Sequence, residues 1–481
     1  MVGRTGVSRE GMEMTRRIAY CSPVNPTHSG ISDYSEELLP YLGQYFDITL
    51  YVDPQLTPSN PAIAQHLTVR ALTQLGTDHQ ARPYDAILYH MGNSPAHTHI
   101  WEAAQHVPGV VVLHDLVLHH FMLQYHAVHR NDSPAYLRLA EDCYGEAGRH
   151  VGHRMLRGIF DDAVFAMPLC QPVLERAQLL ISHSQYVADA VHGITPQLPT
   201  AVVPMGVPVL PLADARVWRA QLGLGDDAFI LASFGHVNPY KRVDQMLRTI
   251  RTLRQAGVNA HYIIVGSVSP AVSLPTLVRR TNTQGAVHVT GYVSASEFNA
   301  YVALADVCIN LRHPTAGETS ASLLRLLAAA KPTLITASGS FLEIPDTAAV
   351  HIPLDASERD MLSHTAYLLY RYPQLRQTLA NNARTYVTTT HTLAQSAAAY
   401  AQTLAQHFGW DAPTPQRPPL WDVTPSAHHP ENPLAPQPVV LPHRATSHGV
   451  IPDRDQAHVK QRLDQLMAEL RFSRPTGSTP S

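Results

Sequence analysis

The fold is decided by the stretch Phe229-Ile-Leu-Ala-Ser-Phe-Gly-His-Val-Asn-Pro-Tyr-Lys-Arg242. Its first six residues are an apolar run of strand length, and a loop with one glycine and two cations follows at once. Continuous apolar runs that alternate with helical stretches are typical of a parallel sheet with helices on both faces. Six such runs occur in this half of the chain, at 229–234, 260–265, 287–290, 307–310, 332–336 and 350–353.

The first half of the chain shows the same alternation. Its expected strands are 17–21, 47–52, 84–90, 109–114, 179–183 and 201–204. The economical interpretation is two doubly wound α/β domains with a seam near residues 206–213, and a mostly helical insertion at 118–178. Ligands of such sheets bind at the carboxyl ends of the strands, so two facing sheet edges would form an interdomain cleft.

The predicted organisation has seven segments. An N-terminal Rossmann-like domain and a C-terminal Rossmann-like domain are followed by a helix that packs back and by a linker with eleven prolines, which is expected to be disordered or extended. A short amphipathic helix comes last, and it could dock on the body, self-associate weakly with another chain or stay loose. The predicted bounds are a flexible N-terminus at 1–16, domains at 17–208 and 209–390, the packing helix at 391–410, the linker at 411–453, the amphipathic helix at 454–472 and a disordered end at 473–481.

Composition excludes several classes of protein. The 481 residues carry 35 Lys and Arg against 38 Asp and Glu, a net charge of −3, which argues against a dedicated nucleic-acid binder. The four cysteines form no CxxC pair, so the sequence indicates neither a zinc site nor a disulfide framework. The apolar runs are too short to cross a membrane, and the first 17 residues lack the apolar core of a signal peptide. We therefore expect a cytoplasmic protein without stable membrane insertion, with peripheral association at the inner membrane face as a further option.

Two loops of the first half carry candidate functional residues. Gly30 precedes a predicted helix, where backbone N–H groups can bind a phosphate. His114 and Asp115 end an apolar strand and would face the cleft. The alternatives are an ordinary strand-to-helix loop and a structural histidine.

Two loops of the second half complete the candidate site. Lys241 and Arg242 suit a diphosphate, because lysine supplies a compact charge and arginine a bidentate fork. Thr319 and Ser320 can cap an apolar helix whose first amides would donate to an anion, while Glu318 beside them suits the hydroxyl groups of a sugar. A solvated basic turn and a carboxylate that only complements the helix dipole are the alternatives.

Over roughly residues 17–408, these motifs resemble the nucleotide-sugar glycosyltransferases of family 4, which have the GT-B fold of two facing Rossmann-like domains. The resemblance rests on the order and spacing of several short strings. They include Ser29-Gly30-Ile31-Ser32-Asp33-Tyr34, Leu113-His114-Asp115, Gly235-His236-Val237-Asn238-Pro239-Tyr240-Lys241-Arg242, Gly291-Tyr292-Val293, Pro314-Thr315-Ala316-Gly317-Glu318 and Lys331-Pro332.

The resemblance implies roles for individual residues. Three are implied to be catalytic: His114 contacts the donor sugar, Lys241 binds the diphosphate of the leaving nucleotide, and Glu318 contacts the transferred sugar. Others are implied to bind the donor, with Tyr292 and Val293 near the base and Gly30 near the phosphates. The donor-binding set is Gly30, Asn238, Arg242, Tyr292, Val293, Thr319 and Ser320.

The chain departs from the family pattern at two positions. His236 stands where many members have arginine directly after the glycine, so Lys241 and Arg242 would have to supply more of the positive charge. The second glutamate of the family's paired-Glu motif is absent, and its place falls on Arg325. Arg325 would then add positive charge near the nucleotide or point to solvent. The roles of Arg325, Asp115 and His236 are therefore left open.

The resemblance implies sugar transfer from a nucleotide diphosphate sugar to a hydroxyl acceptor, with retention of configuration and without metal or other cofactor. The acceptor, whether a saccharide, a lipid-linked molecule or a small molecule, is left open. One alternative is a non-catalytic GT-B scaffold or nucleotide-sugar binding protein, and another is a nucleotide-sugar epimerase or phosphorylase. Metal binding by His119, His120, His126 and His129 is a minor alternative.

Overall fold

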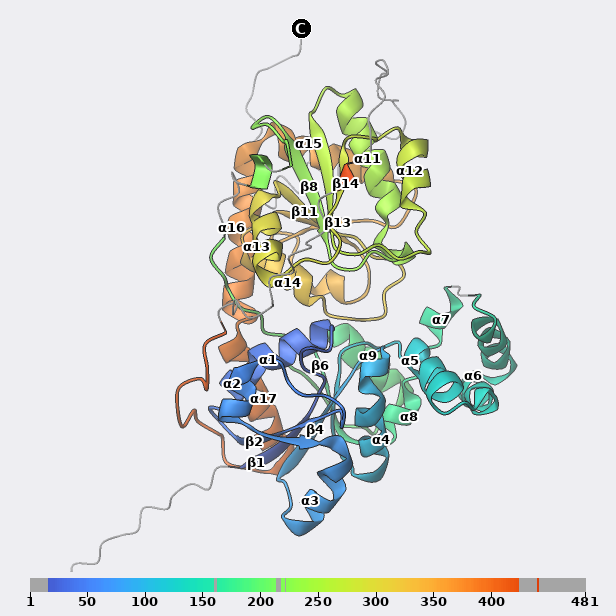
Figure 1. Ribbon diagram of the computed structural model, residues 1–481, viewed down its shortest axis with the longest axis vertical. Coiled ribbons are helices and arrows are strands. Elements are labelled where there is room, and N and C mark those ends of the chain that lie inside the picture. Colours follow the sequence, from blue (N-terminus) through green and yellow to red (C-terminus); the bar gives the residue numbers. More distant parts are fainter. Residues whose placement is uncertain (1–15, 160–161, 213–217, 221, 424–438, 441–481) are drawn as a thin grey trace, which may run out of the picture.

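A computed structural model of the chain describes residues 16–159, 162–212, 218–220, 222–423 and 439–440. The described chain forms two α/β domains, one above the other in Figure 1, and the predicted fold class is confirmed. Residues 1–15, the helix predicted at 454–472 with its self-association, and the end at 473–481 lie outside the described residues.

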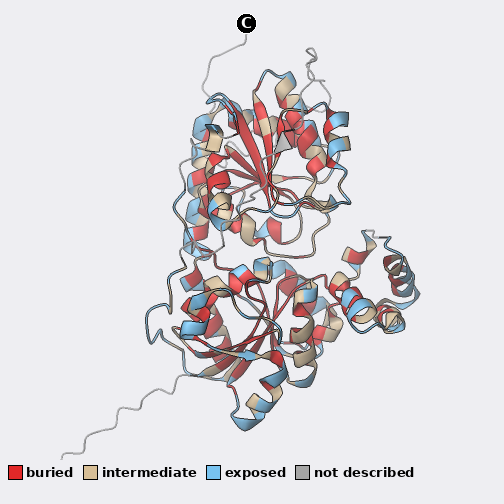
Figure 2. Ribbon diagram, in the orientation of Figure 1, coloured by how far each residue is buried: buried red, intermediate tan, exposed pale blue. Residues whose placement is uncertain are grey.

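The first domain is built on a seven-stranded parallel sheet with the order β3-β2-β1-β4-β5-β6-β7. The central strands are apolar and fully buried, as Figure 2 shows. The short edge strand β3 was not predicted, because it is not buried and lacks a continuous apolar run. The strands are β1 (Arg17–Cys21), β2 (Asp47–Val52), β3 (Thr68–Ala71), β4 (Ala86–Met91), β5 (Gly109–Leu113), β6 (Ala177–Ser182) and β7 (Thr200–Val202).

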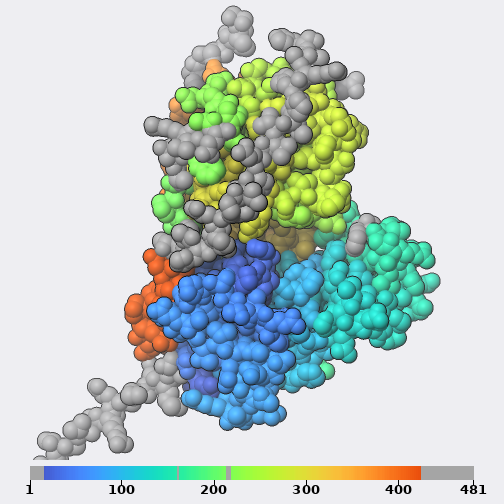
Figure 3. All heavy atoms as spheres, in the orientation of Figure 1, coloured from blue at the N-terminus to red at the C-terminus, as the bar shows by residue number. Residues whose placement is uncertain are grey.

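Helices flank this sheet and form the predicted insertion, which lies to one side of the molecule (Figures 1 and 3). The flanking helices are α1 (Gly30–Leu42), α2 (Pro61–His66), α3 (Leu75–Ala81), α4 (Thr98–His106) and α9 (Gln185–Ile194). The insertion contains α5 (His119–Leu123), a π-helical turn (Gln124–His129), α6 (Ser133–Leu156), α7 (Ala163–Ala166) and α8 (Gln171–Leu174).

The second domain repeats the design with the strand order β13-β12-β11-β8-β9-β10-β14, and all six predicted strands are present. The strands are β8 (Phe229–Phe234), β9 (Ala260–Val265), β10 (Val287–Val289), β11 (Val307–Asn310), β12 (Thr333–Thr336), β13 (Val350–Ile352) and β14 (Val439–Val440). The helices are α11 (Val243–Gln255), α12 (Leu274–Thr281), α13 (Ala295–Leu304), α14 (Ala321–Ala328), α15 (Glu358–Arg371), α16 (Pro373–Thr390) and α17 (Leu393–Phe408).

The last helix of this series, α17, returns to the first domain. It packs along α1, where the Tyr34 hydroxyl donates to the Tyr400 hydroxyl at 3.1 Å. This contact connects two helices, α1 and α17, that are more than 350 residues apart in the sequence.

Of the two alternatives expected for residues 411–453, disordered or extended, the segment 411–423 is an extended chain without helix or strand. This segment runs along the first domain, where Arg417 donates to the carbonyls of Gly43 at 2.7 Å and Phe46 at 3.0 Å. The Leu420 amide donates to the Pro40 carbonyl at 3.1 Å. The last carbonyls of a helix have no partner inside it, so the end of α1 offers acceptors that a proline-rich chain can use. The two residues of β14 also fall in the predicted linker and pair antiparallel with β10.

Candidate active site

The candidate active site lies where the carboxyl edges of the two sheets meet. The amides of Leu116 and Val117, just after β5, donate to the Ala316 carbonyl of the second domain at 2.8 and 3.0 Å. The neighbouring Gly317 has a φ of 78°, and a Cβ there would lie 2.7 Å from the Cβ of Leu116. Only glycine permits this approach, so the sequence at 316–317 sets how closely the two domains meet.

Glu318 is held at this junction by hydrogen bonds. It forms an ion pair with Arg312, and the Thr315 hydroxyl donates to its Oε2 at 2.9 Å. Burial alone would raise the pKa of Glu318, but the charge and hydrogen bond of Arg312 outweigh it and hold the pKa below its usual value. Glu318 is therefore a carboxylate at neutral pH, as binding a sugar hydroxyl requires.

Lys241 approaches the same place from the loop after β8. Its Nζ donates to the Phe234 carbonyl at 2.8 Å. Burial and, to a smaller extent, the Arg312 charge lower the pKa of Lys241 to about 7, against the opposing effect of the Glu318 charge. Asn238 caps the turn that carries Lys241 by accepting a hydrogen bond from the Tyr240 amide at 3.1 Å. The structure places Lys241 near Arg312 and Glu318, and its predicted contact with a diphosphate stays a prediction.

Arg312 is a candidate functional residue that the sequence analysis missed. It follows β11, the strand beside β8 on the side away from β9, so Lys241 and Arg312 flank the point where the strand order reverses. That point is where doubly wound sheets bind ligands. The buried Nε of Arg312 has no hydrogen-bond partner among the described residues. Its position directly after the fourth strand of the second domain was the available signal.

His114 and Asp115 face these charges from the first domain. The Nε2 of His114 lies 2.9 Å from the Nδ1 of His90, and burial together with neighbouring histidines lowers the pKa of His114 well below its usual value. Asp115 accepts a hydrogen bond from the Asn93 amide at 2.8 Å. Burial and the Glu318 charge raise the pKa of Asp115 to about 6, against that hydrogen bond and the Arg312 charge.

The predicted phosphate-binding backbone lies at two helix starts. Gly30 is the first residue of α1, and a Cβ there would meet nothing within 4 Å, so the space beside it is open. Ser320 caps α14 and accepts from the Leu323 amide at 3.3 Å. Thr319 and Ser320 also line an interdomain cavity of about 40 Å³ together with His183.

Arg242 does not supply free charge to the site, which corrects one expectation. Its guanidinium makes two hydrogen bonds to the buried carboxylate of Glu358 on α15. Residue 242 has a φ of 53°, so the chain turns sharply between Lys241 and Arg242. The two cations that are adjacent in sequence therefore serve different partners.

Arg325 does not point to solvent, which corrects a second expectation. It donates to both carboxylate oxygens of Glu37 on α1, at 2.6 and 2.7 Å. Glu37 neutralises the Arg325 charge, which therefore does not serve as free positive charge for the nucleotide. The ion pair also joins α14 of the second domain to α1 of the first.

His236 and Tyr292 lie at the surface, whereas Val293 belongs to the core. His236 is exposed, and its Nδ1 lies 2.8 Å from the Ser267 hydroxyl. Tyr292 is also exposed, and its ring lies 5.1 Å from the ring of His28 in the first domain. Val293 instead packs against the core of the second domain. Tyr292 therefore borders the cleft with its side chain, and contact of the backbone at 292–293 with the base stays a prediction.

The histidines of the insertion offer little to a metal. His119 uses both ring nitrogens within the protein, with Nδ1 at 2.8 Å from the Met167 carbonyl and Nε2 at 2.6 Å from the Tyr136 hydroxyl. Within the described part of the chain, no three His, Cys, Asp or Glu side chains are grouped to hold a metal ion. The same residues contain no helix long and apolar enough to cross a membrane.

Comparison with known proteins shows similarity to glycosyltransferases in the second domain and in the fold. Residues 214–386 match the family model of glycosyl transferases group 1. The described fold resembles the sucrose-phosphate synthase of Thermosynechococcus elongatus, with a TM-score of 0.55, 18% identity and coverage of 82% of this chain and 99% of that one. It also resembles HepE of Anabaena in complex with UDP-glucose, with a TM-score of 0.56, 16% identity and coverage of 81% and 99%. A glycosyltransferase of Rickettsia africae gives a TM-score of 0.57 at 11% identity, with coverage of 82% and 99%. A search of curated protein sequences finds no match.

These findings define a protein with the GT-B fold. Residues 214–386, which include most of the second domain, match the group 1 family model, and the likeness of the chain to the solved structures concerns the fold. Membership of family 4 stays a prediction.

Proposed function

We propose that this protein transfers a sugar from a UDP-sugar to a hydroxyl acceptor, with retention of configuration and without metal. The proposal depends on one observation, the meeting of Lys241, Arg312 and Glu318 with Asp115 at the domain junction. The Arg312 and Glu318 charges each shift the pKa of Asp115 in the first domain and of Lys241 in the second, so the four groups lie close together.

The leaving diphosphate is the main electrostatic problem of the reaction. Negative charge grows on it as its bond to the sugar breaks, and preorganised donors aimed at such charge contribute roughly 3–4 kcal/mol each in comparable sites. Lys241 and Arg312 can supply this stabilisation from two adjacent strands. A bound dianion would also restore the proton to Lys241, whose pKa in the free protein is about 7.

The remaining groups suit the sugar and the acceptor. The Glu318 carboxylate can accept hydrogen bonds from sugar hydroxyls, and neutral His114 can contact the sugar from the other domain. The acceptor oxygen bonds to the anomeric carbon while the bond from that carbon to the phosphate oxygen breaks. Asp115, with a pKa of about 6, is suited to take the acceptor's proton at neutral pH.

UDP as the donor nucleotide has two supports. Structures of HepE, which shares the fold, are described as complexes with UDP and with UDP-glucose. The exposed ring of Tyr292 also borders the cleft on the donor side. Activity in the cytoplasm stays a prediction from the sequence.

An assay of nucleotide release and of glycoside formation over several nucleotide sugars tests this function. We expect UDP release from a UDP-sugar that rises when an acceptor is added, in buffer that contains a metal chelator. Binding of UDP without turnover would favour the scaffold alternative. Conversion of the donor to an isomer would favour an epimerase.

A further inference from the structure

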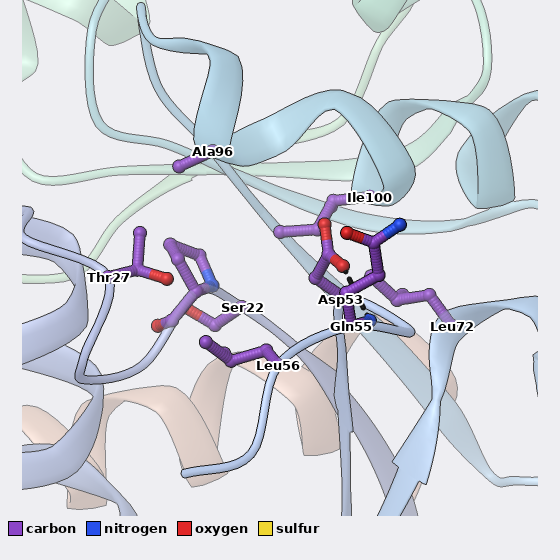
Figure 4. Close-up of a pocket in the computed structure, with 9 residues that line it drawn as sticks. Ser22, Thr27, Asp53, Gln55, Leu56, Leu72, Ala96 and Ile100 are labelled. Atoms are coloured by element: carbon purple, nitrogen blue, oxygen red, sulfur yellow. Dashed lines mark hydrogen bonds between the residues drawn. The ribbon is translucent and has the colours of Figure 1, made fainter. Parts of the chain in front are cut away.

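A cavity of about 240 Å³ opens at the carboxyl ends of β1 and β2 in the first domain. Figure 4 shows Thr27 on one side of it and Asp53 with Gln55 on the other, while Ala96 and Ile100 close it from the α4 side. The cavity is separate from the charged residues of the junction, none of which lines it.

The cavity nevertheless lies beside that junction. Thr27 precedes His28, whose ring contacts Tyr292 of the second domain. Ala96 precedes His97, which binds the carbonyl of His90, the partner of His114. In the sheet order, β1 is two strands from β5, the strand that ends at His114. At about 4.8 Å per strand, the cavity is roughly 10 Å from the transfer site.

The polar groups of the cavity suit hydroxyl ligands. The Asp53 Oδ1 accepts a hydrogen bond from the Gln55 amide nitrogen at 2.8 Å, and its Oδ2 lies 3.4 Å from the Nε2 of His99. Among the described residues, the Thr27 hydroxyl and the Gln55 side-chain amide have no hydrogen-bond partner. Both are therefore free to pair with a ligand.

The charge and size of the cavity narrow the ligand further. Of the described residues that line it, none is Lys or Arg, and Asp53 would repel a phosphate or carboxylate. Apolar side chains such as Leu56 and Ile100 can cover the C–H face of a sugar ring. Pockets for drug-sized ligands measure about 300–1,000 Å³, so this one suits a single ring rather than a lipid chain.

We propose that this cavity binds a neutral saccharide unit of the acceptor, with Asp53 accepting its hydroxyls, while a second unit of the same acceptor presents the reacting hydroxyl at Asp115. This inference rests on the proposed function, because it assigns the acceptor of that same reaction.

The test uses as donor the UDP-sugar that proves active in the assay above. It measures sugar transfer to three acceptors, which are maltose, glucose 6-phosphate and octyl glucoside. We expect maltose to be the best of the three acceptors. Ala96→Leu, which fills the cavity, and Asp53→Asn, which removes its charge, should each raise the KM for maltose at least tenfold and leave donor hydrolysis without acceptor unchanged. Asp47→Asn is the matched control, since Asp47 is exposed at the other end of β2.

The outcomes separate the two proposals. An enzyme that neither hydrolyses nor transfers any donor would overturn the proposed function. An active enzyme whose pocket variants keep the wild-type KM for maltose, or that prefers glucose 6-phosphate or octyl glucoside, would overturn the acceptor assignment alone. Thermal unfolding and saturation-transfer NMR with maltose in the presence of UDP check that Ala96→Leu is folded and has lost only the saccharide contact.

Discussion

The two domains share the order of six parallel strands but place different chemistry at the point where that order reverses. In the first domain, β1 and β4 end near neutral groups, and His90 and His114 are buried with pKa values well below the usual range because of burial. In the second domain, β8 and β11 lead to Lys241 and Arg312. The same scaffold therefore places two neutral histidines and the Asp115 carboxylate on one side of the junction, and the two cations with Glu318 on the other. The cations face the side where a charged diphosphate would bind.

Removal of the Lys241 charge from the second domain's side of the junction should have the largest effect on catalysis. We expect Lys241→Ala to lower kcat by 10²–10³-fold, the loss seen when one preorganised donor to a developing anion is removed. Arg242→Ala is the matched control, because its charge is already paired with Glu358. It should keep kcat within a few-fold of wild type, measured as UDP release at saturating donor. Equal losses in both variants would show that the loop acts through its fold and not through the Lys241 charge.

Arg312 should give the next largest effect. Arg312→Ala removes a cation and leaves Glu318 buried without its ion-pair partner, so the pKa of Glu318 should rise. We expect kcat/KM for the donor to fall at least tenfold, with a further loss as the pH is lowered toward 5. Arg312→Lys should recover part of the activity because it keeps the charge. If Arg312→Ala were as active as wild type, Lys241 would be the sufficient cation of the site.

The fold was more predictable from the sequence than the site. Twelve strands were predicted because continuous apolar runs of strand length are unambiguous when helices separate them. Lys241 and Glu318 were predicted because they follow strands within recognisable strings. The ion pairs of Arg242 and Arg325 were not, because each joins residues far apart in sequence, at separations of 116 and 288 residues. Adjacent cations look equivalent in a sequence, and only the backbone turn at Arg242 separates their partners.

The pH dependence of UDP binding tests the role of the Lys241 charge, with an expected effect of intermediate size. The pKa of Lys241 is about 7 in the free protein, lowered by burial from its usual value, and a bound diphosphate favours the protonated form. Affinity should therefore fall as the pH rises above 7, by up to about tenfold per pH unit. Calorimetric titration between pH 7 and 9 measures this, since Asp115 and the phosphates stay ionised there. Lys241→Met should bind more weakly at pH 7 and lose the slope, and a slope that persists would assign the titration to another group.

The smallest effect on catalysis, with a clear effect on stability, is expected at the Arg325–Glu37 pair. This pair joins α14 to α1 across the domains, and removing one partner leaves a largely buried charge unpaired, which costs about 3–5 kcal/mol when the site is fully buried. Both side chains keep about a fifth of their exposure, so a smaller loss is expected here. Arg325→Ala should lower the melting temperature by several degrees and change the KM for the donor less than threefold. The exchange of the two residues, Glu37→Arg with Arg325→Glu, should recover the stability that either single change loses. A large rise in the donor KM for Arg325→Ala at unchanged melting temperature would instead show that Arg325 contacts the nucleotide. The charged part of the junction would then extend to α1, which carries Glu37.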